Sequence, residues 1–244
     1  MEHLNDYADD RLVYGCIYCG GPEETREHAP SKVFLDSSFP ENLPIVWACR
    51  QCNIGFSLDE EYVACMIECV VAGSTIPDAI RRPRVGNILR QSPQLQARIE
   101  SAKRIVDGCI HFIPEVERVK NVLLKLARGH AVFDLSQVQR CDPDSFQWFA
   151  LTTLTEEQRE DFDAPHVVEL WGEICSRGHQ RLMHLLLPLH GAKDEEIPIP
   201  VTLCDWVVLQ EGRYRYQATD DVEGIVVRIV IGEYLACEVA WSNS

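Results

Sequence analysis

Two Cys-x-x-Cys pairs near the N-terminus constrain the fold of this chain more than any other feature. Cys16 and Cys19 form the first pair, Cys49 and Cys52 form the second, and 29 residues separate the two pairs. Two chelating pairs can supply the four thiolates of a tetrahedral Zn²⁺ site when a loop brings them together. The alternatives are four free buried cysteines, or a redox dithiol, which would not need a second pair. The spacing favours a structural zinc site.

The composition is that of an ordinary globular protein, with 46% hydrophobic and 25% charged residues. No apolar run approaches the length needed to cross a bilayer, so no membrane partner is expected. The acidic, polar N-terminus does not resemble a secretory signal. Besides the two pairs, seven of the eleven cysteines are scattered through apolar contexts, which suits a reducing compartment. We therefore expect a cytoplasmic protein with one zinc site and several buried thiols.

The net charge of −15 argues against a protein that binds nucleic acid through its whole surface. The charge is unevenly distributed, however. Residues 81–128 contain eleven Lys or Arg and only four acids, a local balance of +7. This basic segment could form a phosphate-binding face, or it could consist of ordinary solvated helix faces.

A strand and a helix are predicted around the second cysteine pair. Ile45–Trp47 is a β-prone run that leads into the pair. Ser57 and Glu60 have the Ser-x-x-Glu spacing of a capping box, which predicts that a helix begins there. Gly73 should close this helix by about residue 72.

The rest of the chain is predicted to contain two further helices and then strands. The helices are expected at about 87–107 and 115–128. The apolar run 182–189 indicates a strand, and Glu211-Gly212 indicates a hairpin. The final strands are predicted at about 224–231 and 234–241.

These elements predict an α+β fold in three parts. Residues 1–72 would form a zinc-braced N-terminal module, and residues 73–130 a helical, basic middle segment. Residues 131–244 would form a C-terminal α+β region that ends in antiparallel strands. No motif in this last region indicates its chemistry.

The residues between and beside the cysteine pairs suggest a second, catalytic metal site. Glu27-His28 precedes a proline, Asn42-Leu43 follows, and Asn53 comes directly after the second pair. This order resembles the HNH endonucleases of the ββα-metal class. It is most similar to the branch in which cysteine pairs brace the motif and Asn replaces the last His. The resemblance covers the 45 residues from 16 to 60.

The resemblance implies a role for each of these side chains. His28 would be the general base, Glu27 and Asn53 would bind a catalytic Mg²⁺ or Mn²⁺, and Asn42 would orient His28. The implied reaction is hydrolysis of phosphodiester bonds, in DNA rather than RNA. The implied N-terminal fold is a zinc-braced ββα-metal (HNH) module.

Each of these residues also has an ordinary structural interpretation. His28 could be a loop histidine, Glu27 a surface acid and Asn53 a helix N-cap. Asn42 lies seven residues before Cys49, further than is usual for the family, so its role stays open. The capping box accounts for Glu60 without a metal.

Three basic residues lie beside the motif, and the sequence also permits a second function. Arg26, Lys32 and Arg50 could contact phosphates, although surface charges are common. The alternative function is a non-catalytic zinc-knuckle module that binds nucleic acid or protein. A homo-oligomer or a protein partner would use the C-terminal region.

Overall fold

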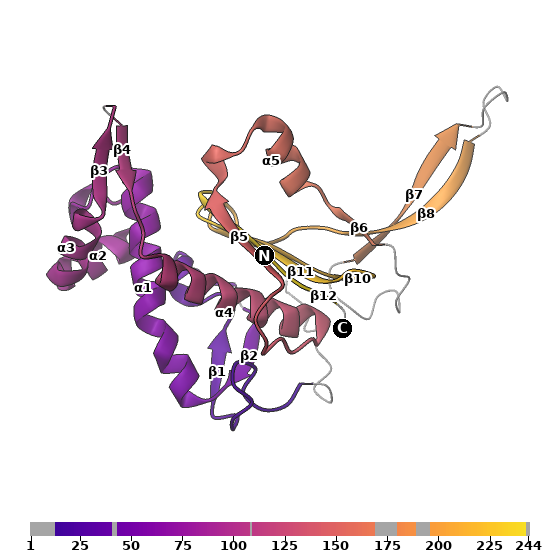
Figure 1. Cartoon of the computed structure of the whole chain (residues 1–244), viewed down its shortest axis with the longest axis horizontal. Coiled ribbons are helices and arrows are strands. Elements are labelled where there is room, and N and C mark those ends of the chain that lie inside the picture. The colour runs from indigo at the N-terminus through magenta and orange to yellow at the C-terminus, as the bar shows by residue number, and fades with distance from the viewer. Residues whose placement is uncertain (1–12, 41–42, 108, 169–179, 189–195, 243–244) are drawn as a thin grey trace.

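The computed structural model describes residues 13–40, 43–107, 109–168, 180–188 and 196–242. They form an α+β fold, which confirms the predicted class (Figure 1). The α-helices are α1 (Arg50–Ala72), α2 (Pro83–Gln91), α3 (Pro93–Ser101), α4 (Val116–Leu135) and α5 (Glu156–Asp163). None of these helices combines the length and the apolar character that a membrane crossing requires.

The described strands form antiparallel sheets. Two are hairpins, β1–β2 and β3–β4, one has the order β6-β8-β7, and the largest has the order β5-β12-β11-β10-β9. The strands are β1 (Thr25–His28), β2 (Ile45–Ala48), β3 (Lys103–Val106), β4 (Cys109–Phe112), β5 (Ser145–Ala150), β6 (His166–Val168), β7 (Gln180–Pro188), β8 (Glu196–Cys204), β9 (Val207–Gln210), β10 (Tyr214–Asp221), β11 (Gly224–Ile231) and β12 (Leu235–Ser242). The strand predicted at 182–189 is β7. The predicted hairpin joins β9 to β10 through Gly212, whose φ is +67°.

Helix α1 begins at Arg50, earlier than the predicted start at Ser57. Cys49 is its N-cap, and the Cys49 sulfur accepts a hydrogen bond from the backbone N–H of Cys52. The Ser57 hydroxyl donates to the carbonyl of Ile54 inside the helix, so it caps nothing. The capping-box prediction is therefore wrong, because the second cysteine pair itself starts the helix. The predicted end is confirmed, since α1 closes at Ala72.

The prediction of one continuous helix at 87–107 is also wrong. Ser92 has non-helical backbone angles and precedes Pro93, which is the first residue of α3. A proline has no N–H and disfavours a helical residue before it, so the helix breaks there. After α3, the β-branched pair Ile105-Val106 belongs to β3, which pairs with β4. Helix α4 starts where predicted but continues to Leu135, because its last turns are also buried.

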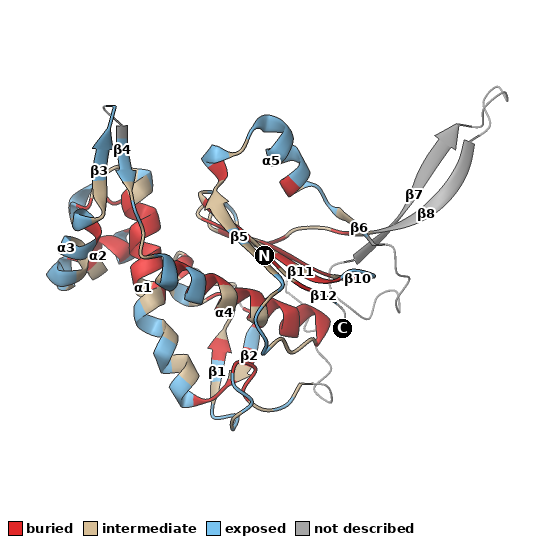
Figure 2. Cartoon of the chain, viewed as in Figure 1, coloured by how far each residue is buried: buried red, intermediate tan, exposed pale blue. Residues whose placement is uncertain are grey.

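Helix α4 lies between the N-terminal hairpin and the large sheet, and packs against α1, β2, β10 and β11 (Figure 1). Figure 2 shows that burial is concentrated along α4, the middle of α1 and the strands of the sheet. His130 of α4 is fully buried, stacks on Tyr216 with ring centroids 3.6 Å apart, and lies 2.7 Å from the hydroxyl of Tyr214. Burial lowers the pKa of His130 to about 3, so this histidine is a neutral packing residue.

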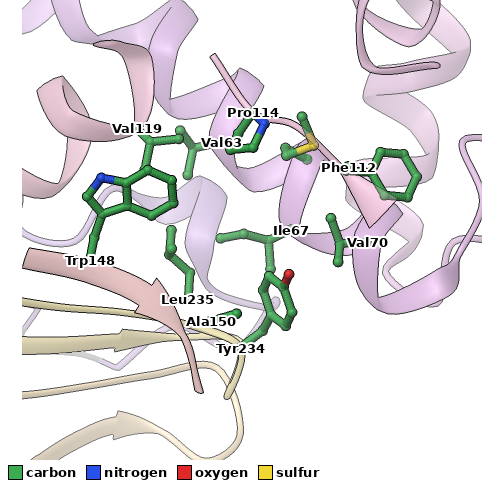
Figure 3. Close-up of a pocket in the computed structure, with 11 residues that line it drawn as sticks. Val63, Ile67, Val70, Phe112, Pro114, Val119, Trp148, Ala150, Tyr234 and Leu235 are labelled. Atoms are coloured by element: carbon green, nitrogen blue, oxygen red, sulfur yellow. The ribbon is translucent and has the colours of Figure 1, made fainter. Parts of the chain in front are cut away.

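A cavity of about 130 Å³ lies between α1, the start of α4 and the edge of the sheet (Figure 3). Its described lining is apolar or aromatic, and includes Ile67, Val119, Trp148 and Leu235. The hydroxyl of Tyr234 is the one titratable group among these lining residues, and burial raises its pKa. No acid, histidine or lysine described here lines the cavity, so it offers no hydrolytic chemistry.

A buried charge cluster ties the segment after β1 to α1 and to the large sheet. Arg82 is almost fully buried and donates to Asp36 at 2.7 Å and to the Leu35 carbonyl at 2.8 Å. Arg213, just before β10, bonds both Asp36 at 2.6 Å and Glu68 of α1 at 3.1 Å. Burial raises the pKa of Glu68, and the neighbouring arginines oppose that shift.

We predict that Arg82→Ala lowers the free energy of unfolding by about 3–5 kcal/mol, because it removes a buried cation from the buried Glu68 and leaves Arg213 as its one described ion-pair partner. Urea unfolding followed by circular dichroism measures this change. The matched control is Arg90→Ala, which breaks an exposed ion pair with Asp78 and should cost about 1 kcal/mol or less. Equal costs for the two variants would contradict this account of the buried cluster.

Candidate metal centres

The two cysteine pairs converge on one point. The sulfurs of Cys16, Cys19, Cys49 and Cys52 all lie within 4.8 Å of one another, and those of Cys19 and Cys49 are 3.7 Å apart. A tetrahedral site with Zn–S bonds of about 2.3 Å places its sulfurs about 3.8 Å apart. The cluster can therefore hold a structural metal ion such as zinc. Within the described residues, no other group of three or more His, Cys, Asp or Glu side chains converges in this way.

Local backbone geometry brings each pair into chelating position. The first pair lies in a tight turn in which Gly20 N–H donates to the carbonyl of Cys16 at 2.8 Å. The second pair spans the start of α1, so the helix fixes both of its sulfurs. Backbone N–H groups also donate to sulfur, from Gly21 to Cys19 and from Cys52 to Cys49, each at 3.4 Å. Such bonds stabilise thiolates.

Strand pairing gives the β1–β2 hairpin two chemically different faces. In the antiparallel register, Thr25 pairs with Ala48 and Glu27 with Val46. Alternation along the strand turns these residues toward α1 and α4, where Ala48 and Val46 are buried. The opposite face carries the remaining two pairs, which are Arg26 with Trp47 and His28 with Ile45.

Glu27 is buried and ion-paired, so it is not the surface acid that one interpretation allowed. It is 6% exposed, and its Oε1 accepts from the ammonium of Lys125 on α4 at 2.7 Å. The Ser31 hydroxyl lies 3.4 Å from the same oxygen. No described residue bonds Glu27 Oε2. One oxygen of this carboxylate is therefore anchored, and the other has no hydrogen-bond partner among the described residues.

Glu60 is a second buried acid that pairs with Lys125, rather than a capping residue. It is 6% exposed, and its Oε1 accepts both from the Lys125 ammonium and, at 2.5 Å, from the Ser31 hydroxyl. Burial raises the pKa of Glu60, and the charge of Lys125 opposes that shift. The ammonium also donates to Ser31 Oγ at 3.0 Å, so its three N–H groups have three acceptors.

Asn53 lies in the first turn of α1, but it is not the N-cap, because Cys49 has that position. Its Nδ2 donates to the hydroxyl oxygen of Thr25 at 3.0 Å. No described residue bonds its Oδ1. Thr25 and Glu27 share the inner face of β1, so Asn53 and Glu27 lie along the same side of the hairpin.

His28 ends β1 on the outer face of the hairpin and is half-buried. Burial lowers the pKa of His28, and the positive charges of Lys32 and Lys125 lower it further, so the neutral ring prevails at pH 7. Its Nδ1 is buried without a hydrogen-bond partner among the described residues. Asn42, which the resemblance assigns to orienting this ring, lies outside the described residues.

The three predicted phosphate contacts are exposed around the hairpin. Arg26 lies over the ring of Trp47 at 5.3 Å, and Lys32 lies over the ring of Phe39 at 5.5 Å. Arg50 is exposed at the start of α1. The structure thus places all three cations near His28 or the cysteine cluster, and their contact with phosphates stays a prediction.

Sequence reasoning missed Lys125 and Thr25. Lys125 carried a signal, because it lies among the apolar residues Val122, Leu123 and Leu126 of the helix predicted at about 115–128. A lysine there must either reach solvent or find a buried acid. Thr25 carried no comparable signal, since a threonine in a strand is ordinary.

Comparison with known proteins adds no assignment to this site. No protein-family model matches the chain, and neither curated proteins nor solved structures show a significant match.

We predict that the purified protein contains about one equivalent of zinc per chain, and that Cys49→Ser reduces this below about half an equivalent. Elemental analysis after exhaustive dialysis measures the zinc content. Cys141→Ser is the matched control, because Cys141 is exposed and does not belong to the cluster. Full zinc retention in the Cys49→Ser variant would contradict a four-cysteine site.

Proposed function

We propose that the chain is a metal-dependent endonuclease of the HNH type that hydrolyses phosphodiester bonds, with DNA as the expected substrate. One observation carries the proposal. Glu27 and Asn53 lie on the same side of the hairpin beside the four-cysteine cluster, and each has one anchored atom and one oxygen that no described residue bonds. His28 follows Glu27 directly and ends the strand.

The two oxygens that no described residue bonds suit a hard divalent cation. Mg²⁺ commonly takes one or two protein oxygens and completes its octahedron with water and phosphate oxygens. Glu27 Oε2 and Asn53 Oδ1 would be these protein ligands, and Mn²⁺ could bind in the same way. Such an ion, when bound, supplies Lewis-acid stabilisation of charge on the phosphate and on the leaving oxygen.

The remaining chemistry belongs to the residues of the chain. His28, neutral at pH 7, would accept a proton from the attacking water. Arg26, Lys32 and Arg50 would hold the backbone of the nucleic acid through its phosphates. The four cysteines, with zinc, would fix the junction of β2 and α1, and with it the position of Asn53.

A non-catalytic zinc-bound module that binds nucleic acid or protein is the second candidate. Its specific support is the ion pair between Glu27 and Lys125, which already gives the proposed metal ligand a cationic partner without a metal. This candidate needs the four cysteines but neither His28 nor Asn53. In both candidates, a reducing cytoplasm would preserve the thiolates, and the region 131–244 would mediate assembly or specificity.

A plasmid-nicking assay tests the proposal. Zinc-loaded protein is incubated with supercoiled plasmid, single-stranded DNA and RNA, each with Mg²⁺, Mn²⁺ or EDTA, and zinc content is checked afterwards. We expect cleavage with Mg²⁺ or Mn²⁺ and none with EDTA. Since a general base contributes about 10²–10⁴-fold to rate, His28→Ala should be slower by at least about 100-fold.

The matched control is His111→Ala, because His111 is exposed on β4, outside the proposed site. It should cleave like the wild type. Cleavage by His28→Ala at the wild-type rate would overturn the nuclease proposal. Binding of any of the three nucleic acids without metal-dependent cleavage would favour the binding module instead.

A further inference from the structure

The hydrogen bond between Thr25 and Asn53 has a direction that matters for metal binding. An asparagine amide can bind a hard cation only through its oxygen, because its NH₂ group is a donor. An amide rotated by half a turn would present the wrong atom. Whether Asn53 can be a ligand therefore depends on what fixes the rotation of its side chain.

We propose that Thr25 is a positioning residue, which turns Asn53 so that Oδ1 faces the divalent cation. This inference rests on the proposed function, because it assumes that Asn53 and Glu27 are the protein ligands. Thr25 itself does not touch the metal. It acts through the amide whose orientation it sets.

The hydroxyl of Thr25 can only accept from Asn53. A hydroxyl has one hydrogen. Thr25 Oγ1 donates that hydrogen to the carbonyl of Ala48 at 3.1 Å, across the hairpin. Its lone pairs then face Asn53, and the atom that meets them at 3.0 Å is the donor Nδ2. Presenting Oδ1 to Thr25 instead would oppose two acceptors, so the amide is held with Oδ1 turned away.

Lys125 does for Glu27 what Thr25 does for Asn53. The ammonium holds Oε1 of Glu27 and leaves Oε2 without a described partner. Glu27 lies two residues after Thr25 on the same strand face, so the side chains of Thr25 and Glu27 project from one side of β1 toward α1. The two oxygens that no described residue bonds thus come from the strand and the helix that the Thr25 to Asn53 hydrogen bond joins.

The Thr25 to Asn53 bond could instead serve only to tie α1 to the hairpin. The two roles make different predictions. A purely structural bond would change thermal stability and leave metal affinity unaltered. A positioning bond would change metal affinity even in a variant that stays folded. Thr25 is half-buried and lies in a strand, so valine, which has the same shape and suits a strand, can replace it.

The experiment measures Mn²⁺ binding to the zinc-loaded full chain by electron paramagnetic resonance, without substrate. Thr25→Val should weaken Mn²⁺ affinity by about 10–100-fold, the usual cost of losing a residue that orients a metal ligand. Thr25→Ser keeps the hydroxyl and should bind Mn²⁺ within about threefold of the wild type. Zinc content should be equal in all three proteins. If Thr25→Val does not fold, Thr25→Ala replaces it with the same expected loss.

A second comparison isolates the orientation of the amide. Asn53→Asp presents an oxygen whichever way its side chain turns, so it no longer needs Thr25. In the Asn53→Asp background, Thr25→Val should therefore change Mn²⁺ affinity by less than about threefold. A loss as large as in the wild-type background would overturn the proposed role of Thr25.

The outcomes separate this inference from the proposed function. If the wild type binds no Mn²⁺, or if Glu27→Gln and Asn53→Ala both bind it as tightly as the wild type, the metal site itself fails. If those two variants lose Mn²⁺ but Thr25→Val does not, only the role of Thr25 is overturned. Weaker Mn²⁺ binding in Thr25→Val, together with near-wild-type binding in Thr25→Ser, supports both the metal site and the positioning role of Thr25.

Discussion

The buried ammonium of Lys125 is the interaction on which the N-terminal part of the structure depends. It joins Glu27 of β1, Ser31 of the following loop and Glu60 of α1 to helix α4. A buried charge is costly unless it is paired and its donors are satisfied, and here three acceptors surround the three N–H groups. The side chain of Lys125 is 0% exposed. Loss of Lys125 would leave two buried carboxylates without a cation, so this contact fixes the hairpin against two helices at once.

The hairpin is therefore held at two points. The cysteine cluster lies at the end of β2 and the start of α1, and the ammonium of Lys125 fixes Glu27 from the other side. Asn53 lies between these two anchors, next to Thr25. In this arrangement the anchoring atoms and the free oxygens belong to the same side chains. No described residue bonds the second oxygen of either side chain, so the ion pair of Glu27 leaves room for the proposed cation.

Much of this site could be predicted from local sequence, and the missing parts are long-range contacts. The cysteine spacing was sufficient to predict the cluster, because chelation needs only two short pairs and a loop. The start of α1 was misplaced because Ser57 and Glu60 match a capping box, while the actual cap is the sulfur of Cys49. The true partner of Glu60 is 65 residues further along the chain, and no local pattern encodes that pairing. The broken helix was predictable in principle, since Pro93 was visible in the sequence.

We propose that Glu27 and Asn53 share one divalent cation, separate from the metal that the four cysteines can hold. Anomalous diffraction from crystals soaked in Mn²⁺, recorded at the manganese and zinc edges, tests it most directly. We predict a zinc peak among the four cysteines and a separate manganese peak beside Glu27 Oε2 and Asn53 Oδ1, with Lys125 still bonded to Oε1 of Glu27. A manganese peak elsewhere, or none while Lys125 holds Glu27, would contradict it.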